Sequence, residues 1–363
     1  MSDAALRVEL DLGALELNHV RVVERLPPQT RLICSVKANA YGHGVRRVVE
    51  RLDQLGVYGV ATASVSDARV LREAGIGARI LLFGGHPPEA APELADEGFT
   101  VTVANPETAA AIAASGARSR SVFVKVDTGL GRLGVPPEEA EALLRETLRP
   151  AGVRVEGIYT HLPFHDAAGQ RWARAGLQRF DGLVRRLRRH GIQPPIVQAL
   201  SSPGIAAGLP PSGNAVCPGR LLYGLVPAVG DAGSWGLEPV LRSIGTRIVH
   251  VRRHAEDAGI GGGGRYAVHA GDTTAVIPFG RSAGNLADMA AGPIVVHRGR
   301  RVPVASISLE HATIDIGAAP AAIGDEVLIL GGDGPGVSAA ELGEWCHLEP
   351  LDMLVALDRG AAR

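Results

Sequence analysis

A ten-residue segment near the N-terminus, Ser35-Val-Lys-Ala-Asn-Ala-Tyr-Gly-His-Gly44, brings together side chains that can do chemistry. The apolar residues 32–34 before it are typical of a short buried strand, and a helix-like pattern follows it, so Lys37 is expected at a strand end. A lone lysine in such a place is usually solvated. This one emerges into a segment that holds an amide, a phenol, an imidazole and two glycines. Because desolvation lowers the pKa of an amine, Lys37 is a candidate Schiff-base nucleophile and proton carrier.

Two further segments place ionisable side chains at the ends of predicted strands. In the first, Lys125-Val-Asp-Thr-Gly-Leu-Gly-Arg-Leu-Gly134, the glycines would bend the backbone tightly toward a ligand. The alternative is a surface ion pair among Lys125, Asp127 and Arg132. The second segment, Tyr159-Thr-His161, puts a histidine at a strand end, where a satisfied polar residue is the more common role.

Strand and helix patterns alternate through most of the chain and indicate which elements position these residues. After residues 32–34, strands are predicted at 57–62, 78–83, 99–103, 121–126, 152–159, 196–200 and 214–217. Helical patterns separate most of them. Repeated strands and helices with short connections imply parallel strands covered by helices, and eight such units fit a TIM barrel. In that fold, chemistry is expected at the carboxyl ends of the strands.

The pattern changes near residue 237, where strand-like runs follow one another without long helices. Gly and Pro signals separate these runs, which is typical of an all-β domain. The Gly- and Ala-rich residues 226–236 are the predicted hinge. We therefore predict an α/β protein with an N-terminal TIM (β/α)8 barrel at residues 1–228 and a C-terminal all-β domain at residues 229–363.

Composition excludes several classes of partner. The 363 residues carry 37 basic and 38 acidic side chains, so no strong field attracts nucleic acid or a membrane surface. No run approaches the roughly 18–20 apolar residues of a membrane span, and the N-terminus lacks the hydrophobic region of a signal peptide, so a cytoplasmic protein is expected. Three cysteines, odd in number and far apart, suggest reduced thiols. We predict no metal site, because Cys346 and His347, if on a strand, would point in opposite directions.

The segment at residues 35–44 resembles, almost letter for letter, the pyridoxal-phosphate lysine motif of the alanine racemase family, which are fold-type III enzymes that use pyridoxal 5′-phosphate (PLP). The resemblance extends from Val8 to about Ile316, and a barrel followed by a β domain is also the order of domains in the family. It implies that Lys37 is joined covalently to PLP and that Tyr41 hydrogen-bonds the cofactor phosphate. It also implies a head-to-tail homodimer, in which the β domain of one subunit completes the site on the barrel of the other.

Several barrel residues match the binding residues of the family. The resemblance implies that Arg132 binds the amino-acid carboxylate and a cofactor oxygen, and that Lys125, which is often carbamylated in the family, braces Arg132 and helps to bind substrate. His161 matches the active-site histidine. The implied phosphate cup consists of Ser201, Ser202, Gly219 and the backbone of Arg220.

Other positions depart from the family pattern. Cys217 stands where the family has an arginine facing the pyridine nitrogen, and Arg220, if on the same strand, would point away from Cys217. Arg281 occupies the place of the tyrosine that opposes the PLP lysine, and a guanidinium is a poor general base at neutral pH. Ser308-Leu-Glu310 replaces a Cys-Met-Asp segment, so Leu309 belongs to the region that crosses the dimer interface toward the substrate.

Together, these features predict a PLP-dependent, alanine-racemase-like enzyme that acts at the Cα of an amino acid, with Lys37, Arg281 and His161 as candidate catalytic residues. Arg281 would bind a second carboxylate or stabilise developing negative charge. Epimerisation with water as the second acid, retro-aldol cleavage, decarboxylation or half-transamination would then replace ordinary alanine racemisation. The alternative is a PLP-binding homologue without turnover, used as a carrier or partner-binding protein.

Overall fold

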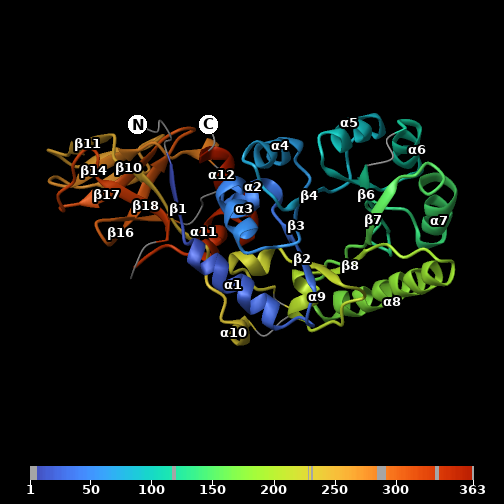
Figure 1. Cartoon of the computed structure of the whole chain (residues 1–363). Coiled ribbons are helices and arrows are strands. Elements are labelled where there is room, and N and C mark those ends of the chain that lie inside the picture. Colours follow the sequence, from blue (N-terminus) through green and yellow to red (C-terminus); the bar gives the residue numbers. More distant parts are fainter. Residues whose placement is uncertain are drawn as a thin grey trace. The chain divides into compact units, whose positions relative to one another are not determined.

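The computed structural model of the chain describes residues 6–116, 120–227, 229, 232–283, 292–331 and 335–361. The chain divides into two compact units (Figure 1). Unit 2 comprises Leu12–Ala40 and Val45–Glu238. Unit 1 comprises Met1–Asp11, Tyr41–Gly44 and Pro239–Arg363.

Unit 2 contains a closed barrel of parallel strands. Its strands are β2 (Arg31–Ser35), β3 (Gly59–Thr62), β4 (Arg79–Leu82), β5 (Thr100–Val103), β6 (Ser121–Lys125), β7 (Arg154–Tyr159), β8 (Ile196–Ser201) and β9 (Ala215–Cys217). Each strand pairs with the next, and β9 pairs with β2 to close the barrel. Most residues of these strands are buried because helices cover one face and the barrel interior covers the other.

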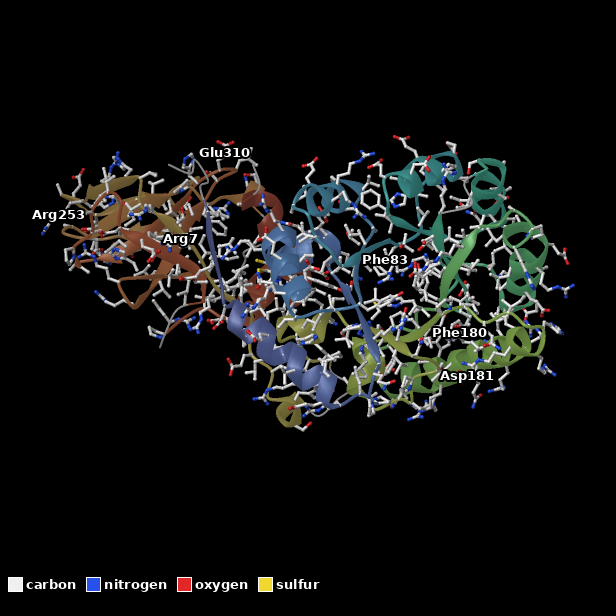
Figure 2. All side chains as sticks on the ribbon, viewed as in Figure 1. Arg7, Phe83, Phe180, Asp181, Arg253 and Glu310 are labelled. Carbon is white, nitrogen blue, oxygen red and sulfur yellow. The ribbon has the colours of Figure 1, made fainter. Side chains whose placement is uncertain are left out.

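Helices and short turns connect the strands (Figure 1). They are α1 (Leu12–Glu24), α2 (Lys37–Gly42), α3 (Val45–Gln54), α4 (Val65–Glu73), η1 (Pro88–Ala90), α5 (Ala91–Asp96), α6 (Pro106–Ala114), α7 (Pro137–Ala142), η2 (Leu143–Leu148), α8 (Ala167–Arg189), α9 (Ser202–Ala206), η3 (Arg220–Tyr223) and α10 (Ala232–Trp235). The longest, α8, is capped by Asp166, whose side chain accepts a hydrogen bond from the Gly169 N–H. Phe180 and its neighbours at helical spacing form its buried face, and Asp181 follows Phe180 on the helix (Figure 2).

Side chains fill the barrel interior. The buried cluster consists of Ile33, Ala61, Leu81, Phe123, Tyr159, Ile196, Ala215 and Cys217. At Gly157 an added Cβ would lie 2.3 Å from the Phe123 ring, so only glycine leaves room for this phenyl group. The barrel is therefore a packed core rather than a channel.

Unit 1 is built on an antiparallel sheet. Its strands are β1 (Arg7–Leu10), β10 (Leu241–Arg247), β11 (His250–Arg253), β14 (Thr273–Ile277), β15 (Ile294–His297), β16 (Arg300–Ile307), β17 (Ala312–Gly317) and β18 (Glu326–Gly331), in the spatial order β1-β10-β18-β15-β16-β17-β14-β11. A separate hairpin joins β12 (Ala258–Ile260) to β13 (Tyr266–Val268). The remaining elements are η4 (Arg281–Ala283), α11 (Ala339–Cys346) and α12 (Pro350–Ala361).

The predicted fold class, a TIM barrel followed by a β domain, is confirmed. Two details differ from the prediction. The strand at residues 7–10, which we placed in a barrel domain of residues 1–228, pairs with β10 in the sheet of unit 1 (Arg7 is labelled in Figure 2). The helices α11 and α12 lie in the region that we predicted to be all-β.

The boundary between residues 228 and 229 remains a prediction, because residue 228 and part of the predicted hinge lie outside the described residues. Within the described chain, no helix is both long and apolar enough to cross a membrane.

Candidate active site at the carboxyl ends of the barrel strands

Lys37 follows directly from strand β2, as predicted. The backbone before it is fixed on both sides, because the Ser35 N–H donates to the Pro218 carbonyl (2.8 Å) and the Val36 N–H donates to the Ala61 carbonyl (2.8 Å). These bonds define the direction in which the chain leaves the barrel. Lys37 keeps part of its surface open to solvent, so a ligand can reach it, although neighbouring groups bury the rest.

The four residues after Lys37 form a left-handed turn, with φ between +52° and +55° at Ala38, Asn39, Ala40 and Tyr41. This conformation costs L-residues about 1–2 kcal/mol each. Hydrogen bonds of Asn39 hold the turn: its side chain accepts from the Val45 N–H (2.7 Å), and its own N–H donates to the Asp67 carboxylate (3.3 Å). Strain of this kind is characteristic of functional sites. The sequence reading did not predict it.

Electrostatic effects identify the side chains that surround Lys37. Burial lowers its pKa, Cys217 opposes this effect, and Arg132 and Arg220 lower the pKa further. Lys125 is 5% exposed, and burial followed by the charge of Arg132 lowers its pKa to about 8, with a smaller contribution from Lys37. Charges shift one another's pKa only at short range, and these groups follow barrel strands whose carboxyl ends meet on one face, so they belong to one site.

His161 belongs to the same cluster. Burial is the main cause that lowers its pKa to about 3, and the positive charges of Lys37, Arg132 and Lys125 add to the effect. The imidazole is therefore neutral across the physiological range and can accept a hydrogen bond, but it is not a cationic acid. Lys37, Lys125, His161 and Cys217 all lie at or just after strand carboxyl ends, as predicted.

The two lysines of this cluster are the only two in the sequence. All other basic residues apart from histidine are arginines. Any lysine-specific reaction or isotope label therefore reports on Lys37 and Lys125 alone.

The segment after Lys125 is a closed loop. Its ends meet where the Asp127 N–H donates to the Val135 carbonyl (2.9 Å) and the Val135 N–H donates to the Lys125 carbonyl (3.0 Å). The Asp127 carboxylate accepts hydrogen bonds from the N–H groups of residues 129, 130 and 131. The Asp127 carboxylate is thus occupied by the backbone of its own loop. The alternative of a surface ion pair with Arg132 is wrong. Among the described residues, neither Lys125 nor Arg132 forms an ion pair.

Tyr159 was not predicted as a site residue. It lies inside the barrel, with the Lys125 amine 5.7 Å from its ring centroid, and its hydroxyl shares a hydrogen bond with Thr102 (3.1 Å). Burial raises its pKa, so the phenol is neutral. One signal was available: on a strand Tyr159 points to the same side as His161.

The residues of the predicted phosphate cup come together between β8, β9 and η3. The Ser202 hydroxyl accepts hydrogen bonds from the N–H groups of Gly219 (2.9 Å) and Leu221 (3.3 Å), which leaves its O–H to donate. The Ser201 hydroxyl oxygen and Arg220 Nε are buried without a protein partner. Buried polar atoms of this kind indicate a missing polar partner.

Cys217 is buried, and burial raises its thiol pKa to about 12, so the thiol is neutral. It lies near Lys37, which has a small opposing effect. The argument that Arg220 lies on the same strand as Cys217 is wrong, because β9 ends at Cys217 and Arg220 begins the turn η3.

The remaining predicted residues belong to unit 1. Arg281 is exposed in η4, and its N–H donates to the Ser308 carbonyl (3.0 Å), while the Ser282 N–H donates to the Leu309 carbonyl (2.8 Å). Leu309, beside Glu310 (labelled in Figure 2), is 62% exposed. Arg281 and Leu309 therefore lie on adjacent loops. Tyr41 is buried, and its contact with phosphate stays a prediction.

The barrel cluster suits PLP. Three cationic side chains of the cluster, Lys125, Arg132 and Arg220, have no ion-pair partner in the described part of unit 2. Together with the unpartnered Ser201 hydroxyl, they fit an anionic ligand that carries a phosphate at one end and meets a reactive amine at the other. The described residues contain no group of three or more His, Cys, Asp or Glu suited to a metal ion.

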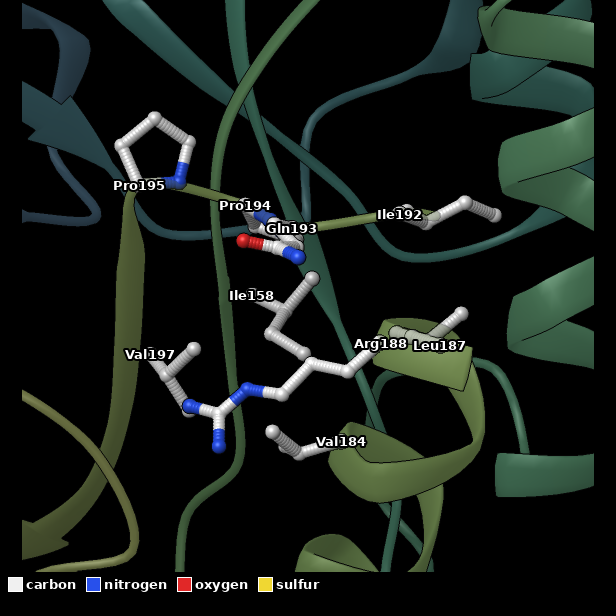
Figure 3. A pocket seen from close by; sticks show the side chains of 9 residues that line it. All are labelled: Ile158, Val184, Leu187, Arg188, Ile192, Gln193, Pro194, Pro195 and Val197. Atoms are coloured by element: carbon white, nitrogen blue, oxygen red, sulfur yellow. The ribbon is translucent and has the colours of Figure 1, made fainter. Parts of the chain in front are cut away.

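A cavity of about 250 Å³ lies apart from these residues (Figure 3). It is lined by residues of β7, α8 and β8, including Ile158, Leu187 and Val197, and Arg188 extends over it. None of the predicted site residues lines this cavity.

Comparisons with known proteins agree with the geometry. The family profiles described as alanine racemase, N-terminal domain, and alanine racemase, C-terminal domain, match residues 10–227 and 241–363. The alanine racemase of Geobacter sp. (strain M21) is 31% identical over 362 residues, covering 96% of this chain and 95% of the relative. That of Symbiobacterium thermophilum is 31% identical over 361 residues, covering 98% and 95%. The solved structure of alanine racemase from Bacillus anthracis with bound L-Ala-P has a TM-score of 0.86 at 26% identity, covering 98% and 94%.

Proposed function

Because the chain belongs to the alanine racemase family, whose members depend on PLP, we propose that it is a PLP-dependent enzyme that moves the Cα proton of an amino acid. The observation that carries this proposal is an accessible amine, Lys37, whose pKa is lowered by burial and by neighbouring guanidinium groups. A lowered pKa increases the neutral fraction of the amine at any given pH, and the neutral amine is the form that bonds an aldehyde and accepts a proton.

When bound, PLP supplies the aldehyde that joins the lysine amine and the ring system that withdraws electrons from Cα. The chain supplies the remaining functions. Lys37 holds the cofactor and moves the proton on one face, and Arg132 binds the substrate carboxylate, braced by Lys125. The neutral His161 and the neutral Cys217 thiol would border the cofactor ring without adding charge. Tyr41, Ser201, Ser202, Gly219 and the backbone of Arg220 would hold its phosphate.

The opposite face differs from the family pattern. Arg281 stands at the position of the family's tyrosine, and a guanidinium does not act as a base at neutral pH. We therefore propose that the reaction is altered: epimerisation with water as the second acid, or a one-sided reaction such as aldol cleavage, decarboxylation or half-transamination. In a head-to-tail dimer, Arg281 and Leu309 of the second subunit would face the substrate. Because the relatives are named alanine racemase, the experiment must distinguish the altered reaction from ordinary racemisation of alanine.

A homologue that binds PLP without turnover is the second candidate, favoured by the same arginine. The test is exchange of the Cα proton for deuterium, followed by NMR on a panel of amino acids in D₂O. Exchange with racemisation supports an ordinary racemase, and exchange without racemisation supports chemistry on the lysine face alone. Absence of both Cα exchange and any new product with every amino acid, in protein that carries the cofactor, supports the carrier.

We also propose a head-to-tail homodimer located in the cytoplasm. The exposed Leu309 beside Arg281 suits a surface that is covered in a dimer, and three buried free thiols suit a reducing compartment. Light scattering after size-exclusion chromatography tests the first proposal, since a monomer at micromolar concentration would contradict it. Cell fractionation with a tagged full-length chain tests the second.

A further inference from the structure

Arg179 reaches the loop that carries Arg132, although the two residues are far apart in the sequence. Its Nε donates to the Thr128 carbonyl at 3.0 Å, and its Nη2 donates to the same oxygen. The contact is close: a Cβ added at Gly129, where φ is +123°, would lie 2.8 Å from Arg179 Nη2. The positive φ at this position favours glycine, and the absence of a Cβ leaves room for the guanidinium.

Helix α8 also packs tightly beneath the same loop. A Cβ added at Gly176 would lie 2.5 Å from Leu162 Cδ2 and 3.4 Å from the Thr128 carbonyl oxygen. Thr128 in turn shares a hydrogen bond with Thr160 (2.8 Å), and both side chains are buried. Thr160 directly precedes His161, so one set of contacts holds the loop of Arg132 and the strand end of His161 against α8.

The loop has two attachments of different kinds. Asp127 ties the loop to itself, since among the described residues its carboxylate accepts hydrogen bonds from N–H groups within the loop. Arg179 and Thr160 tie it to other elements, and they therefore decide where the loop lies relative to the barrel mouth. A charge-assisted bond from two donors fixes direction as well as distance.

We propose that Arg179 is a positioning residue: it holds the loop at residues 127–134 so that Arg132 presents its guanidinium to the carboxylate of the amino-acid substrate. This inference rests on the proposed role of Arg132. Removal of Arg179 does not alter the Arg132 side chain, but it frees the turn at residues 128–131, which precedes Arg132. Affinity for a carboxylate falls as a result, while attachment of the cofactor to Lys37 is unchanged.

The test compares Arg179→Ala and Arg179→Lys with the control Arg174→Ala, which removes an exposed arginine of the same helix. The probe is propionate, a carboxylate without an amino group, titrated into the holoenzyme and followed by the visible absorption of the cofactor. Arg179→Ala is expected to weaken propionate binding on the order of tenfold, because small misplacements of a binding group have effects of this size. Arg179→Lys, which keeps the charge but not the two-donor fork, should fall between the wild type and Arg179→Ala.

Amide hydrogen exchange gives a second readout that needs no cofactor. Arg179→Ala should speed exchange at residues 129–131 and leave the barrel strands as protected as in Arg174→Ala. Wild-type propionate affinity, or wild-type exchange at residues 129–131, would overturn the proposal. Faster exchange throughout the barrel would also overturn it, because Arg179 would then serve stability alone. If Arg179→Ala does not fold, Arg179→Lys decides by the same criteria. Wild-type protein that binds no PLP would refute the proposed function, while loop exchange would still test the role of Arg179.

Discussion

Replacing Lys125 with methionine should stabilise the cofactor-free protein, contrary to what is expected for most substitutions of buried residues. The Lys125 amine is 5% exposed, and burial together with the charge of Arg132 lowers its pKa from 10.5 to about 8. Each unit of pKa shift corresponds to about 1.4 kcal/mol, so the charged amine costs about 3 kcal/mol in the folded state. Methionine has a similar length and no charge, and it keeps contact with the Tyr159 ring.

The effect must depend on pH in one direction. The folded-state pKa lies below the unfolded-state value, so between about pH 8 and 10.5 the unfolded chain binds the proton and the folded protein does not. Wild-type stability therefore rises with pH in this window, and below about pH 8 the full cost remains. The advantage of Lys125→Met should be about 3 kcal/mol at pH 7 and about 2 kcal/mol at pH 9.

Urea unfolding at both pH values measures this difference. In a Trp345→Phe background the two remaining tryptophans, Trp172 and Trp235, both belong to unit 2 and report on the barrel. Arg174→Met, which removes an exposed charge, is the control and should change stability little at either pH. Because the chain has two lysines, a ¹³Cε-lysine label also gives the two amine titrations directly. A Lys125→Met variant less stable than the wild type at pH 7, or an advantage independent of pH, would refute the reasoning.

Three other predictions concern the cluster and the core. Borohydride treatment followed by mass spectrometry should place the cofactor on the peptide of Lys37 and not on that of Lys125, and Lys37→Ala should lose the visible absorption; a label elsewhere would contradict the proposed function. With ¹³CO₂ at about pH 9, where a pKa of about 8 leaves most of the Lys125 amine neutral, a carbamate NMR signal should appear that is absent from Lys125→Met; the lack of any such signal would contradict the likeness to the family at this position. Gly157→Ala should destabilise the barrel by about 1–3 kcal/mol in urea unfolding, because its Cβ would overlap the Phe123 ring. Adding Phe123→Leu should recover part of that loss, and equal destabilisation in the single and double variants would count against this explanation.

Parallel strands explain why much of the site was predictable. Lys37, Lys125, His161 and Cys217 come from strands far apart in the sequence, but each lies at or just after a strand carboxyl end. In a closed parallel barrel those ends meet on one face, so strand patterns alone indicate that the side chains converge. The predicted domain range of 1–228 did not separate the strand at residues 7–10 from the barrel, because its pairing with β10 is a contact between residues far apart in the sequence.

Backbone conformation explains why other features of the site were not predicted from the sequence. The left-handed turn after Lys37 includes two alanines and a tyrosine, residues that carry no signal for positive φ, and the tertiary bonds of Asn39 hold it. The assignment of Arg220 to a strand failed because the strand ends three residues earlier, and element boundaries are the least predictable feature of a sequence.

The sequence by itself determined the alternation of strands and helices, the residue types at the strand ends and the change to a β domain, because each depends on neighbours in the chain. Tertiary structure decided which groups act on one another. Tyr159 lies beside Lys125 because β6 and β7 pair in register, and Arg179 reaches the loop of Arg132 because α8 packs against the barrel. The pKa values of Lys125 and His161 were decided in the same way, since they depend on burial and on charges contributed by other strands.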